Sequence, residues 1–157
     1  KSLIIKTLQN FRGLKYRQQI IYKKKNLIII NDSKSTSFSS TTGILKTSSN
    51  FLWLLGGIPK KGDKFILPQK YCKNIKAFIY GKKKEFFNNQ LKNKIRRENF
   101  INLKDALKKA FLIVKKNRSK EQTILFSPCA ASFDDFKNFE HRGFYFNKLV
   151  KKYLNGI

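Results

Sequence analysis

The sequence has no methionine, and only two cysteines and one histidine occur among its 157 residues. Cys72 and Cys129 cannot form a disulfide framework, so we expect a protein of the reducing cytoplasm. His141 with two separated cysteines makes a poor zinc site, and we therefore expect no bound metal. Because a translated protein begins with Met and this chain opens on Lys1, we expect it to be part of a longer chain.

Long hydrophobic runs are also missing. The longest are "LIII" (27–30) and "FLWLL" (51–55), whereas about 18 apolar residues are needed to cross a bilayer. We expect no membrane association. Apolar residues still make up 41% of the chain, with 15 Phe and 6 Tyr, which is typical of a packed globule of one domain.

Acidic residues are scarce: 9, against 35 basic ones, for a net charge of +26. Such an excess attracts polyanions, and one interpretation is a nucleic-acid-binding surface. The other is a compositional bias, because Lys far outnumbers Arg and Lys, Asn, Ile and Phe are abundant together, as AT-rich codons produce. The basic residues are spread along the chain rather than gathered on one element, which favours a solvated surface.

Strand-like and helix-like patterns alternate along the chain. β-Branched and apolar runs predict strands at 18–24, 26–32, 51–57, 73–81 and 122–126. Helical patterns predict helices at 2–10, 82–95, 103–116 and in the last segment, where the apolar stripe starts at Phe133 and continues through Phe136 and Phe139. Residues 40–49 are ambiguous because Ser and Thr are weak helix formers, but a helix there fits the spacing between two strands. The alternation indicates an α/β fold: a Rossmann-like, mostly parallel sheet with helices on both faces, to which the 17–30 hairpin adds one antiparallel strand. We expect residues 11–157 to form this domain and residues 1–10 to end a preceding segment or linker.

Small and polar residues follow three of the predicted strands. They are "NDSKSTS" (31–37), "GGIPKKGD" (56–63) and "SPCAAS" (127–132). Ligands of such sheets bind beyond the carboxyl ends of the strands. A helix that begins with small residues leaves its amides open to an anion, although small residues can also serve only to allow a tight turn. Three such loops together predict a site for a carboxylate or phosphate.

Other motifs carry little weight. "GIPKKGDK" (57–64) has the glycine spacing of a P-loop, but Asp63 and Lys64 stand where Lys and Ser or Thr are needed. "RGFYFNKL" (142–149) imitates an RNA-recognition octamer, yet it lies in a helical stripe rather than on a strand. Ser127 and Cys129 have no obvious base nearby, so a hydrolase triad is not indicated.

Several segments, in order, resemble motifs of one enzyme family. "NDSKSTS" (31–37) is similar to N-D-S-K-A-T-N, "LLGGIPKKGD" (54–63) to L-G-G-x-x-K, and "FRGLKYR" (11–17) to F-x-G-L-x-H-R. The longest match is "SPCAASFDDFKNFEHRG" (127–143), which is similar to S-P-A-C-A-S-x-D-x-F-x-x-[FY]-x-x-R-G. On these residues the chain resembles the C-terminal domain of the Mur ligases, above all of the members that add D-glutamate to UDP-N-acetylmuramoyl-L-alanine in peptidoglycan synthesis.

The departures from the family pattern are small. Tyr16 stands in place of His, Ser35 and Ser37 in place of Ala and Asn, and the pair Cys129-Ala130 reverses the order Ala-Cys. In "PKKGDK" one residue more than the family pattern leaves a choice between Lys60 and Lys61, and the spacing GG-x-x-K favours Lys60.

The resemblance implies a reaction and partners. The family uses an N-terminal domain for the UDP-sugar, a central ATPase domain that carries the P-loop, and this C-terminal domain. ATP phosphorylates the substrate carboxyl group, and the amine of the amino acid then displaces phosphate. ATP and Mg²⁺ are bound mainly by the central domain, so we expect the isolated chain to be inactive. We expect a cytoplasmic monomer that binds neither nucleic acid nor membrane.

The resemblance also implies roles for single residues in binding D-glutamate. Lys60 would pair with the side-chain carboxylate, Ser132 and the amide of Phe133 would donate hydrogen bonds at a helix N-terminus, Phe139 would wall the pocket two helical turns later, and Thr36 would donate a further hydrogen bond. Without the resemblance, Phe139 could equally be a core residue, and Lys60 a solvated surface charge.

A second group would act on ATP. Lys34 is the catalytic candidate, because it could steady the transferring phosphate or a substrate carboxylate. Asp32 would accept a hydrogen bond from the ATP ribose, and Arg17 would lie near the adenine or phosphates. Alternatively, Asp32 and Ser33 could simply cap the next helix. Two other functions stay open: a Mur ligase that adds a different amino acid, and a basic nucleic-acid-binding domain.

Overall fold

The computed structural model describes residues 13–24, 26–47 and 50–155. The elements in this part are β1 (Gln19–Lys24), β2 (Leu27–Asn31), α2 (Phe38–Leu45), β3 (Phe51–Gly56), the 3₁₀ helix η1 (Gln69–Tyr71), β4 (Ile75–Tyr80), α3 (Lys84–Leu91), β5 (Arg96–Phe100), α4 (Leu103–Lys116), β6 (Gln122–Phe126) and α5 (Phe139–Leu154). The helix predicted at 2–10 lies outside the described residues. Among those that are described, no helix is both long and apolar enough to span a membrane.

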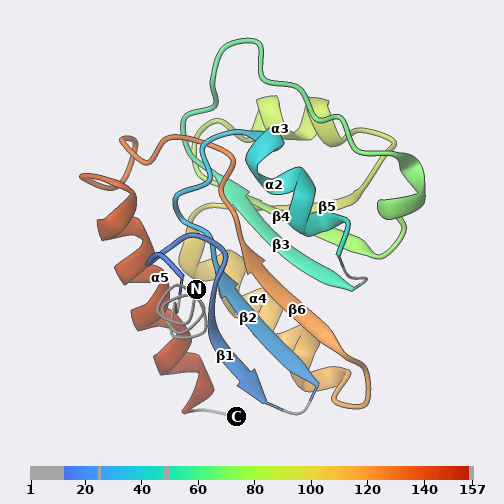
Figure 1. The fold of residues 1–157 in the computed structure, drawn as a ribbon, viewed down its shortest axis with the longest axis vertical. Helices are drawn as coiled ribbons and strands as arrows, with labels where there is room; N and C mark the ends of the chain where they lie inside the picture. The colour runs from blue at the N-terminus through green and yellow to red at the C-terminus, as the bar shows by residue number, and fades with distance from the viewer. Residues whose placement is uncertain (1–12, 25, 48–49, 156–157) are drawn as a thin grey trace, which may run out of the picture.

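The strands form one six-stranded sheet in the order β1-β2-β6-β3-β4-β5. β1 pairs with β2 in the antiparallel sense, and the other pairings are parallel. The predicted α/β class and the antiparallel hairpin are therefore confirmed. β6, which comes last in sequence, lies between β2 and β3 (Figure 1). As a result, the loops that follow these three strands leave the sheet at neighbouring positions.

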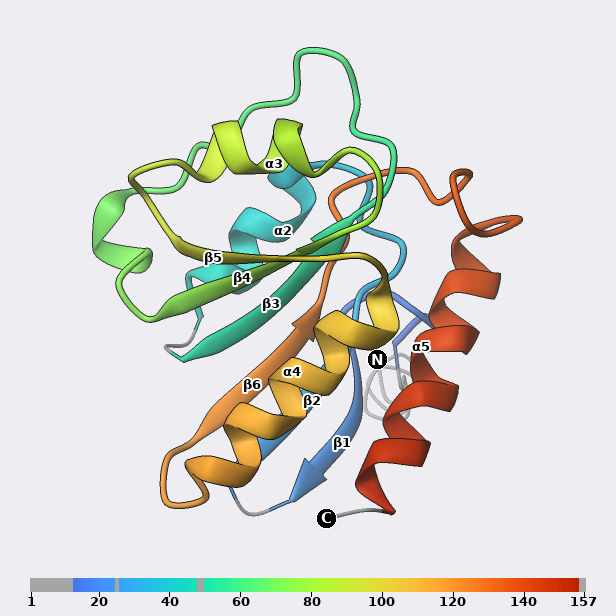
Figure 2. The same cartoon turned by 180° about the vertical axis from the view of Figure 1, so that it is seen from behind.

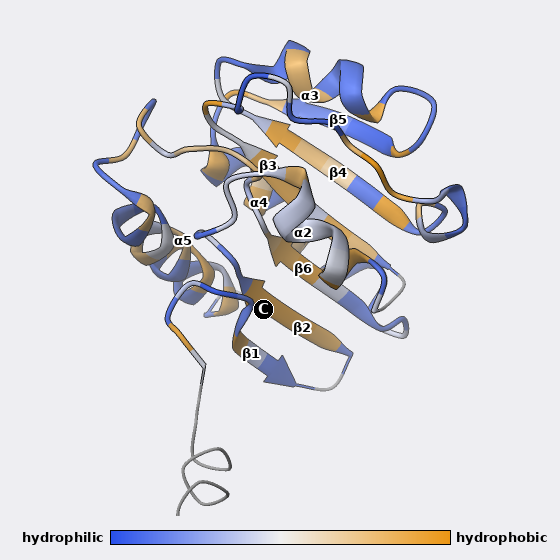
Figure 3. Cartoon of the chain, turned by 45° about the horizontal axis from the view of Figure 1, so that its top comes forward, coloured by the Kyte–Doolittle hydropathy of each residue, from blue (hydrophilic) through white to orange (hydrophobic). Residues whose placement is uncertain are grey.

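Helices cover both faces of the sheet, as predicted (Figure 2). On one face, α2 and α3 pack on a cluster of aromatic and aliphatic side chains around Trp53, with Phe38 and Phe87 from the two helices. On the other face, α4 and α5 pack on a second cluster that includes Phe126 and Phe146. The central strands are accordingly apolar on both sides (Figure 3), as buried parallel strands usually are.

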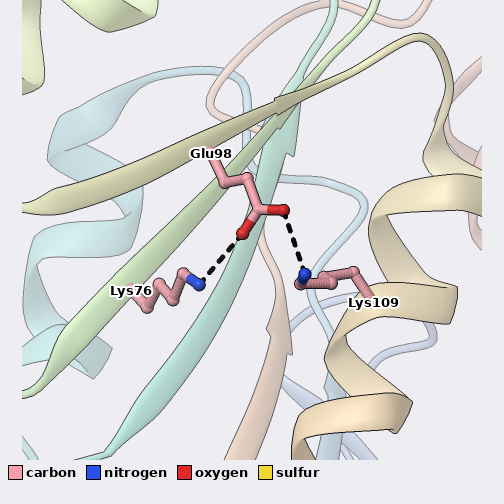
Figure 4. A network of polar contacts seen from close by, with 3 residues as sticks. All are labelled: Lys76, Glu98 and Lys109. Atoms are coloured by element: carbon pink, nitrogen blue, oxygen red, sulfur yellow. Dashed lines mark hydrogen bonds and ion pairs between the residues drawn. The ribbon is translucent and has the colours of Figure 1, made fainter.

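Strand β5 was not indicated by the sequence pattern. Its residues, "RRENF", are exposed or only half-buried, because β5 is the edge strand next to β4. Glu98 accepts ion pairs from Lys76 of β4 at 3.0 Å and from Lys109 of α4 at 3.4 Å (Figure 4). Charged residues on an edge strand lack the apolar alternation on which a sequence-based prediction depends.

The start of the last helix was predicted wrongly. α5 begins at Phe139, with the Asn138 side chain accepting from the amide of His141 as its N-cap. Phe133 lies before the helix and its side chain is 72% exposed, whereas Phe136 packs against His141 and Tyr145. Phenylalanines three residues apart can therefore belong to a loop whose aromatic rings contact a neighbouring helix.

Two other helices are shorter than predicted or shifted. α2 spans Phe38–Leu45 and begins two residues before the predicted 40–49, because Ser37 provides the N-cap; residues 48–49 of that prediction lie outside the described residues. α3 ends at Leu91 rather than at residue 95. Asn93 beyond it has a positive φ of 61°, a conformation that interrupts a right-handed helix.

Candidate functional site

The candidate site is the set of three loops that follow β2, β3 and β6, residues 31–37, 56–63 and 127–138, which we call the rim. The Ser127 hydroxyl donates to the Asp32 carboxylate at 2.8 Å and joins the first loop to the third. Ile58 and Ala131 form an antiparallel bridge with N–H···O distances of 3.0 and 2.9 Å, which joins the second loop to the third. The three loops therefore meet on one edge of the sheet, as predicted.

Asp32 is buried at the start of the first loop, with 5% exposed surface. Besides Ser127, its carboxylate accepts from the amide of Gln18 at 3.1 Å. Burial raises the pKa of Asp32 to about 6, although the bonds from Ser127 and Gln18 and the charge of Arg17 oppose this rise. Asp32 and Ser33 do not cap α2, because Ser37 does. Arg17 is exposed and, through its charge, acts on Asp32, so these two predicted ATP residues lie on the same side of the rim.

Lys34 and Phe139 are in direct contact. The Lys34 Nζ lies 3.8 Å from the centroid of the Phe139 ring, and both residues are half-buried. A cation over an aromatic face is held by the quadrupole of the ring. We predicted Phe139 two helical turns beyond Ser132. This is wrong, because Phe139 is the first residue of α5. Thr36, half-buried, follows in the same loop as Lys34.

Lys60 and Ser132 lie on the two loops that the Ile58–Ala131 bridge joins. Lys60 and Lys61 are both exposed, and Ser132 is 3% exposed. Within the described residues, the structure records no direct contact between the Lys60 side chain and Ser132. The two predicted ligands are therefore neighbours through the backbone, and the Lys60 side chain is available to solvent.

Open helix N-termini do not form the rim, so this part of the prediction is wrong. Ser132 lies in a turn, where its carbonyl accepts from the amide of Phe136 at 2.9 Å. At α2, the amide of Phe38 donates to the Asp63 carboxylate at 2.9 Å. A carboxylate from the second loop thus already occupies the start of α2, where an anion would be favoured.

Beneath the rim lies a buried network of hydroxyl and thiol groups that the sequence pattern did not indicate. Thr41 Oγ1 lies 2.5 Å from Ser127 Oγ, 2.8 Å from Ser35 Oγ and 3.0 Å from Cys129 Sγ. Burial raises the pKa of Cys129 to about 12. Cys129 is therefore a packed thiol rather than a nucleophile.

Arg142 is a second residue that the sequence reasoning did not assign to the site. It belongs to α5, is 1% exposed, and hydrogen-bonds to Ser33 and Ala130. The sequence did indicate that Arg142 is buried, since it lies three residues after Phe139 and four before Phe146, on the buried side of the helix. An arginine on an apolar stripe must find acceptors inside the fold.

The described residues do not provide a metal site. No three His, Cys, Asp or Glu side chains among them lie close enough to hold a metal ion. At the rim, Asp32 is buried and both of its oxygens already accept hydrogen bonds. The donor set on the rim therefore does not fit Mg²⁺, which requires several oxygen ligands.

A cleft of about 530 Å³ lies away from the rim, at the opposite ends of the strands. Basic side chains, Lys24, Arg118 and Lys120, line it together with apolar ones such as Leu27 and Val114. This cleft is a basic surface that a nucleic-acid-binding domain would use, but it contains none of the predicted site residues.

The fold is an α/β domain in which the three loops that follow β2, β6 and β3 meet at one edge of the sheet. The chain is similar to proteins named UDP-N-acetylmuramoylalanine--D-glutamate ligase: 36% identical over 151 residues to one from Wolbachia sp. subsp. Brugia malayi (strain TRS), 40% over 154 residues to one from Hydrogenobaculum sp. (strain Y04AAS1), and 38% over 154 residues to one from Rickettsia prowazekii (strain Madrid E).

These matches cover 96%, 97% and 96% of the chain but only 30%, 36% and 34% of the relatives. The chain thus spans about a third of the length of the ligases it matches. A scan against models of protein families finds no match. On the identity over nearly its whole length, the chain belongs to the Mur ligase family, as its motifs predict.

Proposed function

We propose that this chain is the C-terminal, amino-acid-binding domain of a ligase that adds D-glutamate to UDP-N-acetylmuramoyl-L-alanine. The observation that carries the proposal is the meeting of three separate motifs on one rim, through the Asp32–Ser127 hydrogen bond and the Ile58–Ala131 bridge. Homologues of that name support the choice of substrates. The rim brings cations and hydroxyl groups together, which is the chemistry that a dicarboxylic amino acid needs.

The reaction joins a carboxyl group to an amine. The γ-phosphoryl group of ATP passes to the carboxylate of the nucleotide substrate and releases ADP. The amine of D-glutamate then forms the amide bond, loses a proton and displaces phosphate. This domain would contribute by holding the amine close to the activated carbonyl carbon, and positioning of this kind lowers the barrier without a strongly tuned base.

The rim residues divide into two groups in this proposal. Lys60 pairs with the side-chain carboxylate of D-glutamate, while Ser132, Thr36 and the amide of Phe133 donate hydrogen bonds to the amino acid. The Phe133 ring faces solvent, so its contribution would come from the backbone. Phe139 forms the wall of the pocket and, through its contact with Lys34, fixes the direction of that cation.

Lys34, Asp32 and Arg17 form the second group. The Lys34 ammonium lies half-buried over an aromatic ring, and would stabilise the negative charge of the transferring phosphoryl group. Asp32 would accept a hydrogen bond from the ATP ribose, and Arg17 would lie near the adenine or the phosphates. Mg²⁺ and most contacts to ATP would come from the rest of the ligase, because the donor set on the rim does not fit the metal. We propose a monomer in the cytoplasm.

The test is an amino-acid panel with the full-length ligase that carries this domain. Amide formation should be fastest with D-glutamate, and Ser132→Ala should raise the KM for D-glutamate about tenfold or more, as expected for the loss of a hydrogen bond to a charged group. Faster turnover of a different amino acid would contradict the substrate. If Ser132→Ala raised the KM for D-glutamate and the KM for ATP equally, Ser132 would be a structural residue.

The isolated chain offers a second check. It has no P-loop, so chain 1–157 with ATP, D-glutamate and the nucleotide substrate should release no phosphate above background. Addition of the remaining domains should restore turnover. Phosphate release by the isolated chain would contradict the assignment of ATP to another domain.

Nucleic-acid binding is the competing function, favoured by the net charge of +26 and by the basic cleft lined by Lys24, Arg118 and Lys120. Binding to DNA or RNA through phosphate contacts weakens steeply with salt. We expect only such nonspecific binding, abolished near physiological salt. Tight binding that persists in salt and is lost in Arg118→Ala would favour the competing function.

A further inference from the structure

Arg142 is the most deeply buried cation that the described part of the chain places next to the rim. Its Nε donates to the Ser33 hydroxyl at 3.1 Å, and its Nη2 donates to the carbonyls of Ser33 at 2.8 Å and Ala130 at 3.0 Å. Ser33 precedes Lys34 in the first rim loop, and Ala130 lies two residues before Ser132 in the third. One guanidinium therefore joins the two loops that carry these candidate ligands.

Gly57 brings the second rim loop close to Arg142. A Cβ at Gly57 would lie 3.2 Å from Nη1 of Arg142 and 2.4 Å from the carbonyl oxygen of Ala131, and its φ is +125°. The absence of a side chain thus lets the second loop, which leads to Lys60, approach the guanidinium closely. All three rim loops contact or closely approach one side chain of α5.

The charge of Arg142 is not neutralised by an ion pair within the described residues. Its bonds go to a hydroxyl and to carbonyls, and its Nη1 has no hydrogen-bond partner there. The Tyr80 hydroxyl and one oxygen of Asp134 are likewise buried and unpartnered. Burying a guanidinium is costly. The hydrogen bonds to Ser33 and Ala130 and the attraction of the Asp134 carboxylate offset this cost in part, and the positive charge stays fixed beneath the rim.

The same turn of α5 also holds the first loop in other ways. Ser33 Oγ donates to the carbonyl of Phe139 at 2.9 Å, and the Asn31 amide donates to the carbonyl of Gly143 at 2.9 Å. Contacts of the first loop are therefore concentrated at the amino end of α5. A rigid helix, rather than the loops themselves, sets where the loop residues stand.

We propose that Arg142 is a positioning residue for the amino-acid site: from beneath the rim its guanidinium holds the loops of Lys34 and Ser132 in register and supplies a fixed positive charge that favours an anionic amino acid. The inference rests on the proposed function. Arg142 acts through Ser33 and Ala130 and need not touch the substrate.

Steady-state kinetics of the full-length ligase test this role. Arg142→Lys keeps the charge, but its single nitrogen cannot reproduce the planar fork that reaches Ser33 and Ala130. We expect the KM for D-glutamate to rise about tenfold, the change expected for the loss of one hydrogen bond to a charged group, while the KM for UDP-N-acetylmuramoyl-L-alanine changes less than about twofold. Arg96→Lys, on the exposed edge strand β5, is the matched control and should change neither.

The pattern of constants separates the possible outcomes. If Arg142 only stabilises the fold, the variant contains fewer active molecules, so kcat falls while both KM values stay constant, and the inference is wrong. If the wild-type ligase does not use D-glutamate, the proposed function fails instead. Should Arg142→Lys not fold, Ser33→Ala removes the Nε acceptor and the bond that ties the first loop to the Phe139 carbonyl; a raised KM for D-glutamate supports the inference, and an unchanged one overturns it.

Discussion

The hydroxyl of Ser127 donates a 2.8 Å hydrogen bond to the carboxylate of Asp32, although 95 positions separate them in the chain. The bond links the ends of β6 and β2, two parallel neighbours in the sheet. It brings together the motifs "NDSK" and "SPCAAS", which the sequence shows only as separate segments. Burial raises the pKa of Asp32 and the bond from Ser127 opposes this rise, so the pair can be probed by pH.

Asp32→Asn should change how folding stability depends on pH. Burial raises the pKa of Asp32 from 3.8 to about 6, so between these values the folded state binds a proton that the unfolded state does not. The contribution of Asp32 to the free energy of unfolding therefore falls as pH rises through this window. Between pH 4 and pH 7.5, the free energy of unfolding of the variant should rise by up to about 2 kcal/mol relative to that of the wild type. Urea unfolding at each pH measures this difference. A difference that is independent of pH would contradict this prediction.

Two glycines offer a matched pair of substitutions. A Cβ at Gly143 would lie 2.4 Å from the ring of Tyr16, whereas a Cβ at Gly43 in α2 meets nothing within 4 Å. Gly143→Ala should destabilise the chain by about 1–3 kcal/mol through overpacking, while Gly43→Ala should stabilise it by up to about 1 kcal/mol through helix propensity. Thermal unfolding measures both.

The Tyr16 ring is the cause of the predicted strain at Gly143. If so, Tyr16→Ala combined with Gly143→Ala should cost less than the sum of the two single substitutions, because the methyl group gains the space of the ring. Strict additivity would show that Gly143 is required for a different reason.

Lys60 and Lys61 are adjacent and both exposed, so they can be compared directly in the full-length ligase. Lys60→Ala should raise the KM for D-glutamate at least about tenfold through the loss of a charged hydrogen bond, and Lys61→Ala should leave it nearly unchanged. The reverse pattern would assign the carboxylate to Lys61. Equal small effects would mean that both are solvated surface charges.

The two thiols should be inert in the folded chain. Cys72 and Cys129 are both free and buried, and burial raises the pKa of each thiol, to about 12 for Cys129. Because the thiolate is the reactive form, Ellman's reagent should label neither cysteine until denaturant is added, when both should react. Rapid labelling of one thiol in the native chain would contradict the packing around it.

Local patterns in the sequence predicted most of the fold correctly. Residues 103–116 form α4 and 122–126 form β6, as their apolar spacing indicates. The spacing failed at the edge strand β5, whose charged residues have no buried face, and at Phe133, whose exposed ring belongs to a loop. An apolar period indicates which residues of a helix or strand are buried. It therefore misses an element with little buried surface, and it predicts a helix wrongly where loop residues have the same spacing.

The candidate site was predicted only in part. The three motif loops do meet, but the helix N-termini expected at two of them are not open: Asn138 caps α5, and Asp63 bonds to the start of α2. Arg142 and Thr41 were not assigned to the rim. The apolar stripe places Arg142 on the buried side of α5, but the partners of Arg142 and Thr41 lie on other segments, which the local sequence does not identify.

What the sequence by itself determined is most of the buried elements and the family to which the chain belongs, because residue propensities, apolar period and motif spacing are all local. The tertiary structure alone decided which loops are neighbours: β6 inserts between β2 and β3, which precede it in the chain. That strand order brings Asp32 to Ser127 and Ala131 to Ile58, and packs α5 so that Arg142 is buried beside the first and third loops. Pairing between strands is a non-local choice, made by the burial of both faces of the sheet, and the electrostatics of the rim follow from it.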